Sequence, residues 1–235
     1  MQLIAMLTML IDHLGYVFFQ DEHWMRIVGR IAFPIYCYLL VAGYNRTRSR
    51  KRYALRLLVL ALVSQLPFTF AFRTLHVNVI GTLLVALLII MAIDRFRGRA
   101  ALQWTVGIAL VALTYWPMEA LHFDYATYGV LLVLIYRYLP NAGAMLAGHF
   151  LLNVLYVYEF ESFTQFYSIF TTLAIAAVRL NAPDARTEVR LPRWLWRSFY
   201  PAHLALIALA EWWIYGDLYS EAMRWVLVPL FGNPV

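Results

Sequence analysis

The stretch Thr8-Met-Leu-Ile-Asp-His-Leu-Gly15 lies within a long apolar run, and Gly29-Arg-Ile-Ala-Phe-Pro34 opens the next one. Both runs are long enough to cross a bilayer as helices, which places Asp12, His13 and Arg30 where water is scarce. Insertion scales put the cost of a central Asp or Arg at about 2.5–3.5 kcal/mol, so such residues usually pair and usually serve a site or a pathway. The sequence therefore predicts a functional helical hairpin at the start of the chain.

The composition is that of a membrane protein along the whole chain. Of 235 residues, 63% are hydrophobic, and the mean hydropathy is +0.66. Soluble domains average about 45–50% apolar residues. Eight Trp and sixteen Tyr fit aromatic belts at two membrane interfaces. The single cysteine, Cys37, excludes an intrachain disulfide and a cysteine-rich metal site.

The apolar runs predict an all-α fold, a polytopic bundle of about nine transmembrane helices that forms one domain over residues 1–235. Helices are expected because backbone polar groups in lipid must be satisfied within the segment. The spans are expected near residues 2–20, 27–45, 53–72, 76–94, 101–118, 122–139, 142–158, 162–180 and 197–216.

The charges of the loops predict the orientation of these spans. Basic loops, such as Arg46–Arg52 and Arg95–Arg99, alternate with acidic ones, such as the loop that contains Glu119 and Asp124. The positive-inside rule then places the N-terminus in the cytoplasm and the C-terminus outside. The segment Asn181–Arg197 is expected at the inner interface. The last apolar run, residues 223–231, is too short to span and is expected at the outer face.

The trio in the first hairpin has the chemistry of an acid–base site. A neutral His13 can act as a general base near neutral pH, and Arg30 can hold a developing oxyanion or a carboxylate. Asp12 points about 100° around the helix from His13, so it is expected to pair with Arg30 or Arg26 instead. The alternative is structural: an Asp–Arg pair fixes the hairpin, and His13 is a hydrogen-bonded bystander.

Other polar residues have weaker functional readings. His149 and Asn153 share one helix face, where a packing hydrogen bond is favoured over substrate contact. His203 is expected at the inner end of the ninth span, either as an interfacial histidine or as a contact for a cytoplasmic donor. The cluster of Glu119, His122 and Asp124 matches no standard ligand spacing, so no metal is expected.

The loop from Arg46 to Arg52, together with Arg56, can bind phosphates of a cytoplasmic cofactor. The sequence alone favours a simpler role for this loop, which is to set the membrane topology and to contact lipid headgroups. The chain contains no Walker A loop, dinucleotide fingerprint, HExxH or GxSxG motif. A nucleotide-driven pump, a zinc protease and a serine hydrolase therefore lack support.

A set of motifs, in order along nearly the whole chain, resembles the TraX family. The motifs are Ile11-Asp-His-Leu-Gly15, Arg26-Ile-Val-Gly-Arg-Ile-Ala-Phe-Pro34, Gly43-Tyr44, Leu55-Arg-Leu57, Ser64-Gln-Leu-Pro67, Asp124-Tyr-Ala-Thr-Tyr-Gly129 and Tyr200-Pro-Ala-His203. The family's namesake acts in conjugation and acetylates the N-terminal residue of pilin. TraX proteins are also similar to transmembrane acyltransferases that modify sugars, including the lysosomal glucosaminide N-acetyltransferase, which carry an essential intramembrane histidine.

The resemblance implies an acetyltransferase in the bacterial inner membrane that uses cytosolic acetyl-CoA as its acyl donor. The acceptor would be an amine or hydroxyl of a pilin N-terminus, another peptide or an envelope glycan, with membrane lipids as further partners and no nucleic acid. The implied catalytic residues are His13, Asp12 and Arg30. The residues expected to contact acetyl-CoA are Arg46, Arg50, Arg52, Arg56 and His203, and those expected to contact the acceptor are Asn78, Asp124, Tyr125 and His149.

Two other functions fit the same sequence. In a small transporter or channel, Asp12, His13 and Arg30 would form a proton relay or a substrate counter-ion. In a non-catalytic scaffold for pilus or envelope assembly, replacement of His13 would leave function intact.

Overall fold

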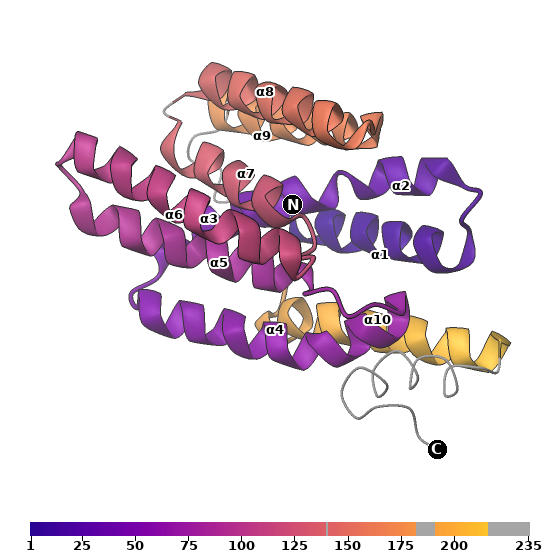
Figure 1. The fold of residues 1–235 in the computed structure, drawn as a ribbon. Coiled ribbons are helices and arrows are strands. Elements are labelled where there is room, and N and C mark those ends of the chain that lie inside the picture. Colours follow the sequence, from indigo (N-terminus) through magenta and orange to yellow (C-terminus); the bar gives the residue numbers. More distant parts are fainter. Residues whose placement is uncertain (140, 182–190, 216–235) are drawn as a thin grey trace.

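The computed structural model describes residues 1–139, 141–181 and 191–215, and within these ranges the chain forms helices and no strand (Figure 1). The all-α prediction is therefore confirmed. The helices are α1 (Gln2–Phe18), α2 (His23–Gly29), α3 (Ala32–Arg46), α4 (Arg50–Phe72), α5 (Val79–Ile93), α6 (Ala100–Ala120), α7 (Ala126–Tyr138), α8 (Ala142–Phe160), α9 (Ser168–Asn181) and α10 (Arg193–Tyr215), with short 3-10 turns η1 (Asp94–Phe96) and η2 (Phe163–Tyr167). Each span expected from hydropathy contains a helix. The apolar run at 223–231 and most of the loop before α10 lie outside the described residues.

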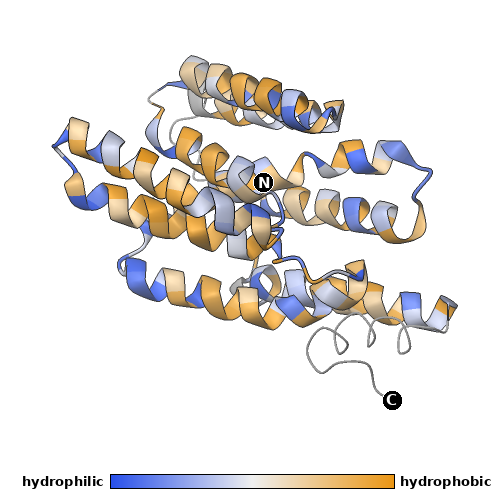
Figure 2. Ribbon diagram, in the orientation of Figure 1, coloured by the Kyte–Doolittle hydropathy of each residue, from blue (hydrophilic) through white to orange (hydrophobic). Residues whose placement is uncertain are grey.

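Four helical segments are long and apolar enough to cross a membrane: His23–Arg46, Arg50–Phe72, Val79–Phe96 and Ala100–Ala120. Shorter apolar helices cover Gln2–Phe18, Ala126–Tyr138 and Phe163–Val178. Apolar residues dominate the helices, and hydrophilic residues gather at many of the turns (Figure 2). Many large apolar side chains on the outside of the bundle, such as Leu113, are exposed, which is expected where the surrounding solvent is lipid. The chain is thus a polytopic membrane protein, and the number of spans and their orientation stay predictions.

The helices form layers (Figure 1). Helices α4 and α10 pair on one side, α8 and α9 pair on the other, and the remaining helices lie between them. The core is made by α3, α5 and α7, where Cys37, Leu87, Ile90 and Leu132 are fully buried. This arrangement brings α1 and α10, from opposite ends of the sequence, into contact.

The expected span near residues 27–45 lies within one helical segment, His23–Arg46, which contains a short turn between α2 and α3. Helix α2 ends at Gly29, and α3 begins at Ala32. Pro34 has no N–H to donate to the carbonyl of Arg30, and its ring conflicts with that carbonyl in a regular helix. The backbone N–H groups of Arg30 and Ile31 instead bond three residues back. Arg30, in this turn, donates a hydrogen bond to Asp12 of α1 at 3.1 Å.

Charged side chains join the helices at one end of the bundle. Asp94, just after α5, accepts hydrogen bonds from Tyr44 at 2.9 Å, Arg137 at 2.6 Å and Tyr138 at 3.0 Å. The guanidinium of Arg50 lies 4.7 Å from the centre of the Tyr44 ring. We call this end of the bundle, with residues 44–56 and 191–197, the basic end. The opposite end, with residues 74–78 and 119–125, is the acidic end.

Candidate active site

A cavity of about 1480 Å³ lies between the α4–α10 pair and helices α1, α3 and α5, and its lining residues extend toward both ends of the bundle. At the basic end its walls include Arg56, Trp196 and Arg197. At the acidic end they include Glu119 and Asp124. Side chains with different chemistry therefore line its two ends.

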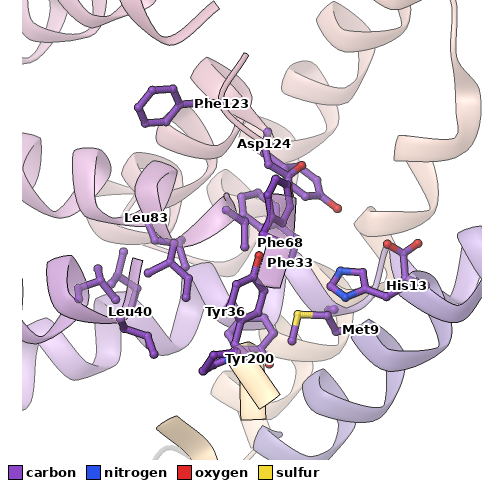
Figure 3. Close-up of a pocket in the computed structure, with 18 of the residues that line it drawn as sticks. Met9, His13, Phe33, Tyr36, Leu40, Phe68, Leu83, Phe123, Asp124 and Tyr200 are labelled. Carbon is purple, nitrogen blue, oxygen red and sulfur yellow. The ribbon is translucent and has the colours of Figure 1, made fainter. Parts of the chain in front are cut away.

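The middle of the cavity is mostly apolar and aromatic. Met9, Phe33, Tyr36, Phe68 and Tyr200 line it, and Figure 3 shows the imidazole of His13 at its edge. A small polar group can be placed here among apolar side chains, as is typical of ligand pockets.

His13 is held by an aromatic cage. Its Nδ1 lies 2.8 Å from Nε2 of His203, and the two rings are nearly parallel, at 12°. Phe72 packs edge-on against His13 at 4.9 Å between ring centres, and Phe199 stacks on His203 at 4.5 Å. Nε2 of His13 makes no hydrogen bond to any described residue, and His13 lines the cavity. The geometry leaves one imidazole nitrogen available to a bound molecule.

Asp12 bonds to two arginines and not to His13. Its Oδ1 lies 2.8 Å from Arg26 and 3.1 Å from Arg30. The expected pairing of Asp12 with Arg30 or Arg26 is thus confirmed, with both partners. Arg30 also donates to Gln165 at 3.1 Å and to the carbonyl of Arg26 at 3.2 Å. Because all three of its nitrogens are engaged, Arg30 is arranged to orient Asp12 and to join α2 to the η2 turn.

Arg26 is the more accessible of the two arginines. Its side chain is 31% exposed, against 12% for Arg30, and both line the cavity. Its guanidinium lies 5.1 Å from the centre of the Tyr16 ring. The sequence offered Arg26 only as a partner for Asp12, because its accessibility depends on where α2 is interrupted.

The loop before α7 places Asp124 and Tyr125 at the acidic end of the cavity. The backbone of Asp124 is fixed by bonds to Val77 at 2.9 Å and Thr82 at 2.6 Å. The Tyr125 ring stacks on Phe33 at 3.8 Å between ring centres. Burial raises the pKa of the Asp124 carboxyl to about 6, against the opposing effect of Arg30. Both residues are in position to contact a ligand.

Two residues expected to bind the acceptor have other partners and do not line the cavity. Asn78 caps α5 by accepting from the backbone of Ile80 at 3.1 Å, and it donates to the carbonyl of Ala61 and to Gln65, each at 2.8 Å.

His149 is fully buried, where it contacts Tyr128 at 2.9 Å and Thr172 at 2.5 Å. Asn153 joins the same network by accepting from Tyr128 at 2.8 Å. These contacts correspond to the packing hydrogen bonds that the sequence favoured for this pair of residues.

The four arginines expected to bind acetyl-CoA are in different surroundings. Arg56 lines the cavity, near the Tyr53 ring. Arg50 lies over Tyr44, while Arg46 and Arg52 are exposed and do not line it. Sequence reasoning did not propose Trp196 and Arg197 as ligand contacts. The position of these two residues at the cavity depends on the packing of α10 against α4.

His203 lies near the middle of α10, not at the inner end of a span as the sequence predicted. The helix begins at Arg193, so His203 is about 15 Å along it at 1.5 Å per residue. The sequence-based span began at residue 197, which made His203 appear closer to the interface. Its position beside His13 separates it from the basic end.

Within the described parts of the chain, no group of three or more His, Cys, Asp or Glu side chains is arranged to hold a metal ion. His76 and His122, at the acidic end, stack at 4.9 Å between ring centres. Burial, and then the neighbouring His122, lower the pKa of His76.

Comparison with known proteins identifies the family to which this chain belongs. The chain is 27% identical to the probable fimbrial assembly protein FimC, serogroup H1, of Dichelobacter nodosus, over 90% of this chain and 94% of that protein. A shorter region is 34% identical to the uncharacterized protein RP591 of Rickettsia prowazekii (strain Madrid E), over 30% of this chain and 26% of that protein. No solved structure gives a significant match. The TraX protein family matches residues 1–210, and the chain therefore belongs to the TraX family.

Proposed function

We propose that this protein is an acetyltransferase of the bacterial inner membrane, which moves an acetyl group from cytosolic acetyl-CoA to an amine or hydroxyl at the outer side. The observation that carries the proposal is the unbonded Nε2 of His13 beside a cavity that extends toward both ends of the bundle. A donor and an acceptor approaching from opposite sides can meet at such a group.

The basic end of the cavity suits the coenzyme. Arg56 and Arg197 offer guanidinium groups to phosphates, which guanidinium binds in bidentate geometry. Trp196 stacks on Tyr36 at 5.2 Å between ring centres, and the flat pair offers a surface for the adenine. The exposed Arg46, Arg50 and Arg52 raise the positive potential near this mouth and so attract a polyanion. The pantetheine arm then lies along the apolar middle.

The acidic end suits an amine. Glu119 and Asp124 offer carboxylates to an ammonium group, and Tyr125 adds an aromatic ring. One relative is named a probable fimbrial assembly protein. A pilin-like protein with a free terminal amine is therefore our leading acceptor, and other peptides or envelope glycans are the further candidates.

The reaction follows from the free nitrogen of His13. As the acceptor attacks the thioester carbonyl, Nε2 takes the acceptor's proton, the carbon–sulfur bond breaks, and the imidazolium returns the proton to the coenzyme thiolate. In a covalent variant, Nε2 attacks the thioester carbonyl and displaces the CoA thiolate; the acceptor then attacks the acetyl-imidazolium, which frees Nε2 of His13, and the acceptor's proton passes to the thiolate. Arg26, with the more exposed guanidinium, is the better placed arginine to oppose charge on the carbonyl oxygen.

The test compares purified protein in nanodiscs with its His13→Gln variant. Release of free CoA from acetyl-CoA is followed with a thiol reagent, with and without a terminal-amine peptide. A general base contributes about 10²–10⁴-fold, so the variant is expected to lose the acceptor-dependent release. His23→Gln, at an exposed position at the start of α2, is the matched control and should keep the wild-type rate. Equal acetyl transfer by wild type and His13→Gln would remove His13 from the reaction.

A transporter remains the second candidate, because the same cavity runs past a buried group of charges, as proton relays do. It predicts solute or proton flux in proteoliposomes and no consumption of acetyl-CoA. Folded protein that neither binds nor turns over acetyl-CoA would favour this function.

A further inference from the structure

We propose that His203 is a positioning residue that fixes the tautomer of His13, so that the proton of His13 is on Nδ1 and the bare basic nitrogen, Nε2, faces the cavity. The part that concerns rate rests on the proposed acetyl transfer. The tautomer itself follows from contacts in the structure and can be tested without any substrate.

The argument begins at a backbone carbonyl. Nδ1 of His203 lies 2.6 Å from the carbonyl oxygen of Phe199, one helical turn earlier in α10. A carbonyl oxygen can only accept a hydrogen bond, so Nδ1 of His203 must carry a proton.

The hydrogen bond between His203 and His13 can then have only one donor. A neutral imidazole carries a single N–H, so Nε2 of His203 is a lone pair that accepts. Nδ1 of His13, at 2.8 Å, must therefore be the donor. The one remaining nitrogen of His13, Nε2, has no proton. The carbonyl of Phe199 thus determines that Nε2 of His13 carries no proton, although it does not contact that nitrogen.

The surroundings favour the neutral form of both rings. His203 is 5% exposed and His13 is 9% exposed. The rings of Phe72, Phe199 and Tyr200 surround the pair. An isolated charge is strongly disfavoured in such surroundings, because it loses its hydration and gains no counter-charge.

Among the residues that the structure describes, no carboxylate bonds to either histidine. Asp12, the neighbouring acid, is already bonded to Arg26 and Arg30. In a Ser-His-Asp triad a carboxylate orients the catalytic imidazole. In this protein the neutral imidazole of His203 takes the place of that carboxylate beside His13. It defines the tautomer without placing a negative charge in the apolar middle of the cavity.

The first test reads the tautomer directly. Nitrogen-15 NMR of histidine-labelled protein in nanodiscs distinguishes bare from protonated ring nitrogens, and His13→Gln assigns the signal. Wild type is expected to show His13 with a bare Nε2. His203→Leu, which removes the acceptor, should move His13 toward the Nε2–H tautomer that free histidine favours. A His13 that is already protonated on Nε2 in wild type would overturn the proposal, whatever reaction the protein performs.

The second test separates positioning from folding. His203→Gln keeps an amide oxygen that can accept from His13, whereas His203→Leu does not. By analogy with groups that orient metal-binding histidines, His203→Leu should lower kcat about 10- to 100-fold, with little change in the KM for acetyl-CoA. His203→Gln should show only part of that loss, and the control His23→Gln should keep the wild-type kcat.

The two proposals fail separately. Equal losses in the Gln and Leu variants, or a loss confined to KM, would contradict the positioning role. A confirmed tautomer in a protein that shows no acetyl transfer would instead refute the proposed function and leave the assignment of His203 standing.

Discussion

Gly29 lies directly against the side chain of Asp12, so that a methyl group at position 29 would overlap the Asp12 carboxylate. Gly15 makes a similar contact one turn away, where an added Cβ would sit 2.7 Å from Cβ of Met25. Two glycines therefore set the separation of α1 and α2, as small residues do where membrane helices approach closely. This separation brings Asp12 within reach of Arg26 and Arg30.

We expect Gly29→Ala to impair the site more than any effect on helix propensity would suggest. Alanine ordinarily favours a helix over glycine by about 1 kcal/mol. Here the methyl group must displace Asp12, so the variant should lose stability and most acetyl transfer. Thermal unfolding in detergent, together with CoA release, measures both. Gly143→Ala is the control, since its Cβ would have only an ordinary contact at 3.5 Å. A Gly29→Ala protein as stable and active as Gly143→Ala would contradict the prediction.

Asp12→Asn should destabilise the protein more than Arg30→Gln does. Removal of the carboxylate leaves the two arginines close together without the group that bonds both of them, and breaking a buried pair costs about 3–5 kcal/mol. Removal of Arg30 leaves Asp12 still paired with Arg26 at 2.8 Å. Comparing midpoints of thermal unfolding for the two variants tests this order. The reverse order would show that Arg30 makes the more important contacts, through Gln165.

Asp94→Asn is expected to lower stability without changing the acetyl-transfer rate of the folded protein. Asp94 accepts from Arg137, Tyr44 and Tyr138, and none of these four residues lines the cavity. The exposed Glu159→Gln provides a control for charge removal. Rates are compared at a temperature where both variants remain folded. A changed KM for acetyl-CoA in Asp94→Asn would contradict the prediction and mean that the contacts of Asp94 also shape donor binding.

Asp124 should make stability fall as pH rises between about 4 and 6. Burial raises its pKa to about 6 in the folded protein, above the value of about 3.9 expected for an unfolded chain. The protonated form is therefore favoured on folding, and this stabilisation is complete below pH 4 and lost as pH rises through 6.

The measurement is the difference in unfolding midpoint between wild type and Asp124→Asn from pH 4 to 7. Wild type should lose stability relative to the variant over this range, while the exposed Asp21→Asn should run parallel to wild type. A constant difference between wild type and Asp124→Asn would contradict a raised pKa at this position.

The sequence predicted the helical fold and the pairing of Asp12 because both depend on local rules. Long apolar runs require helices in lipid, and the angle between successive helical residues turns Asp12 away from His13. The interruption near Arg30 was also encoded locally, by Pro34, but a search for apolar length alone passes over it.

No local pattern in the sequence predicted that His203 is the hydrogen-bond partner of His13. His203 follows a proline in a motif that reads equally well as an interfacial segment, and only the packing of α10 against α1 brings it to the site. The same is true of Asn78, whose amide caps α5 and bonds to α4, although its polarity alone suggested a ligand contact. Polar residues in apolar helices are easy to find, but which of them face a cavity depends on the tertiary structure.

The bond between His13 and His203 joins residues 190 positions apart, and this has a consequence for the order in which the protein is made. Asp12 can pair with Arg26 and Arg30 as soon as the first hairpin leaves the ribosome and enters the membrane. His13 must wait until almost the whole chain has been synthesised and α10 has been inserted. A nascent chain therefore carries a paired hairpin but a His13 without its hydrogen-bond partner, and the proposed tautomer of His13 can be set only when insertion is nearly complete.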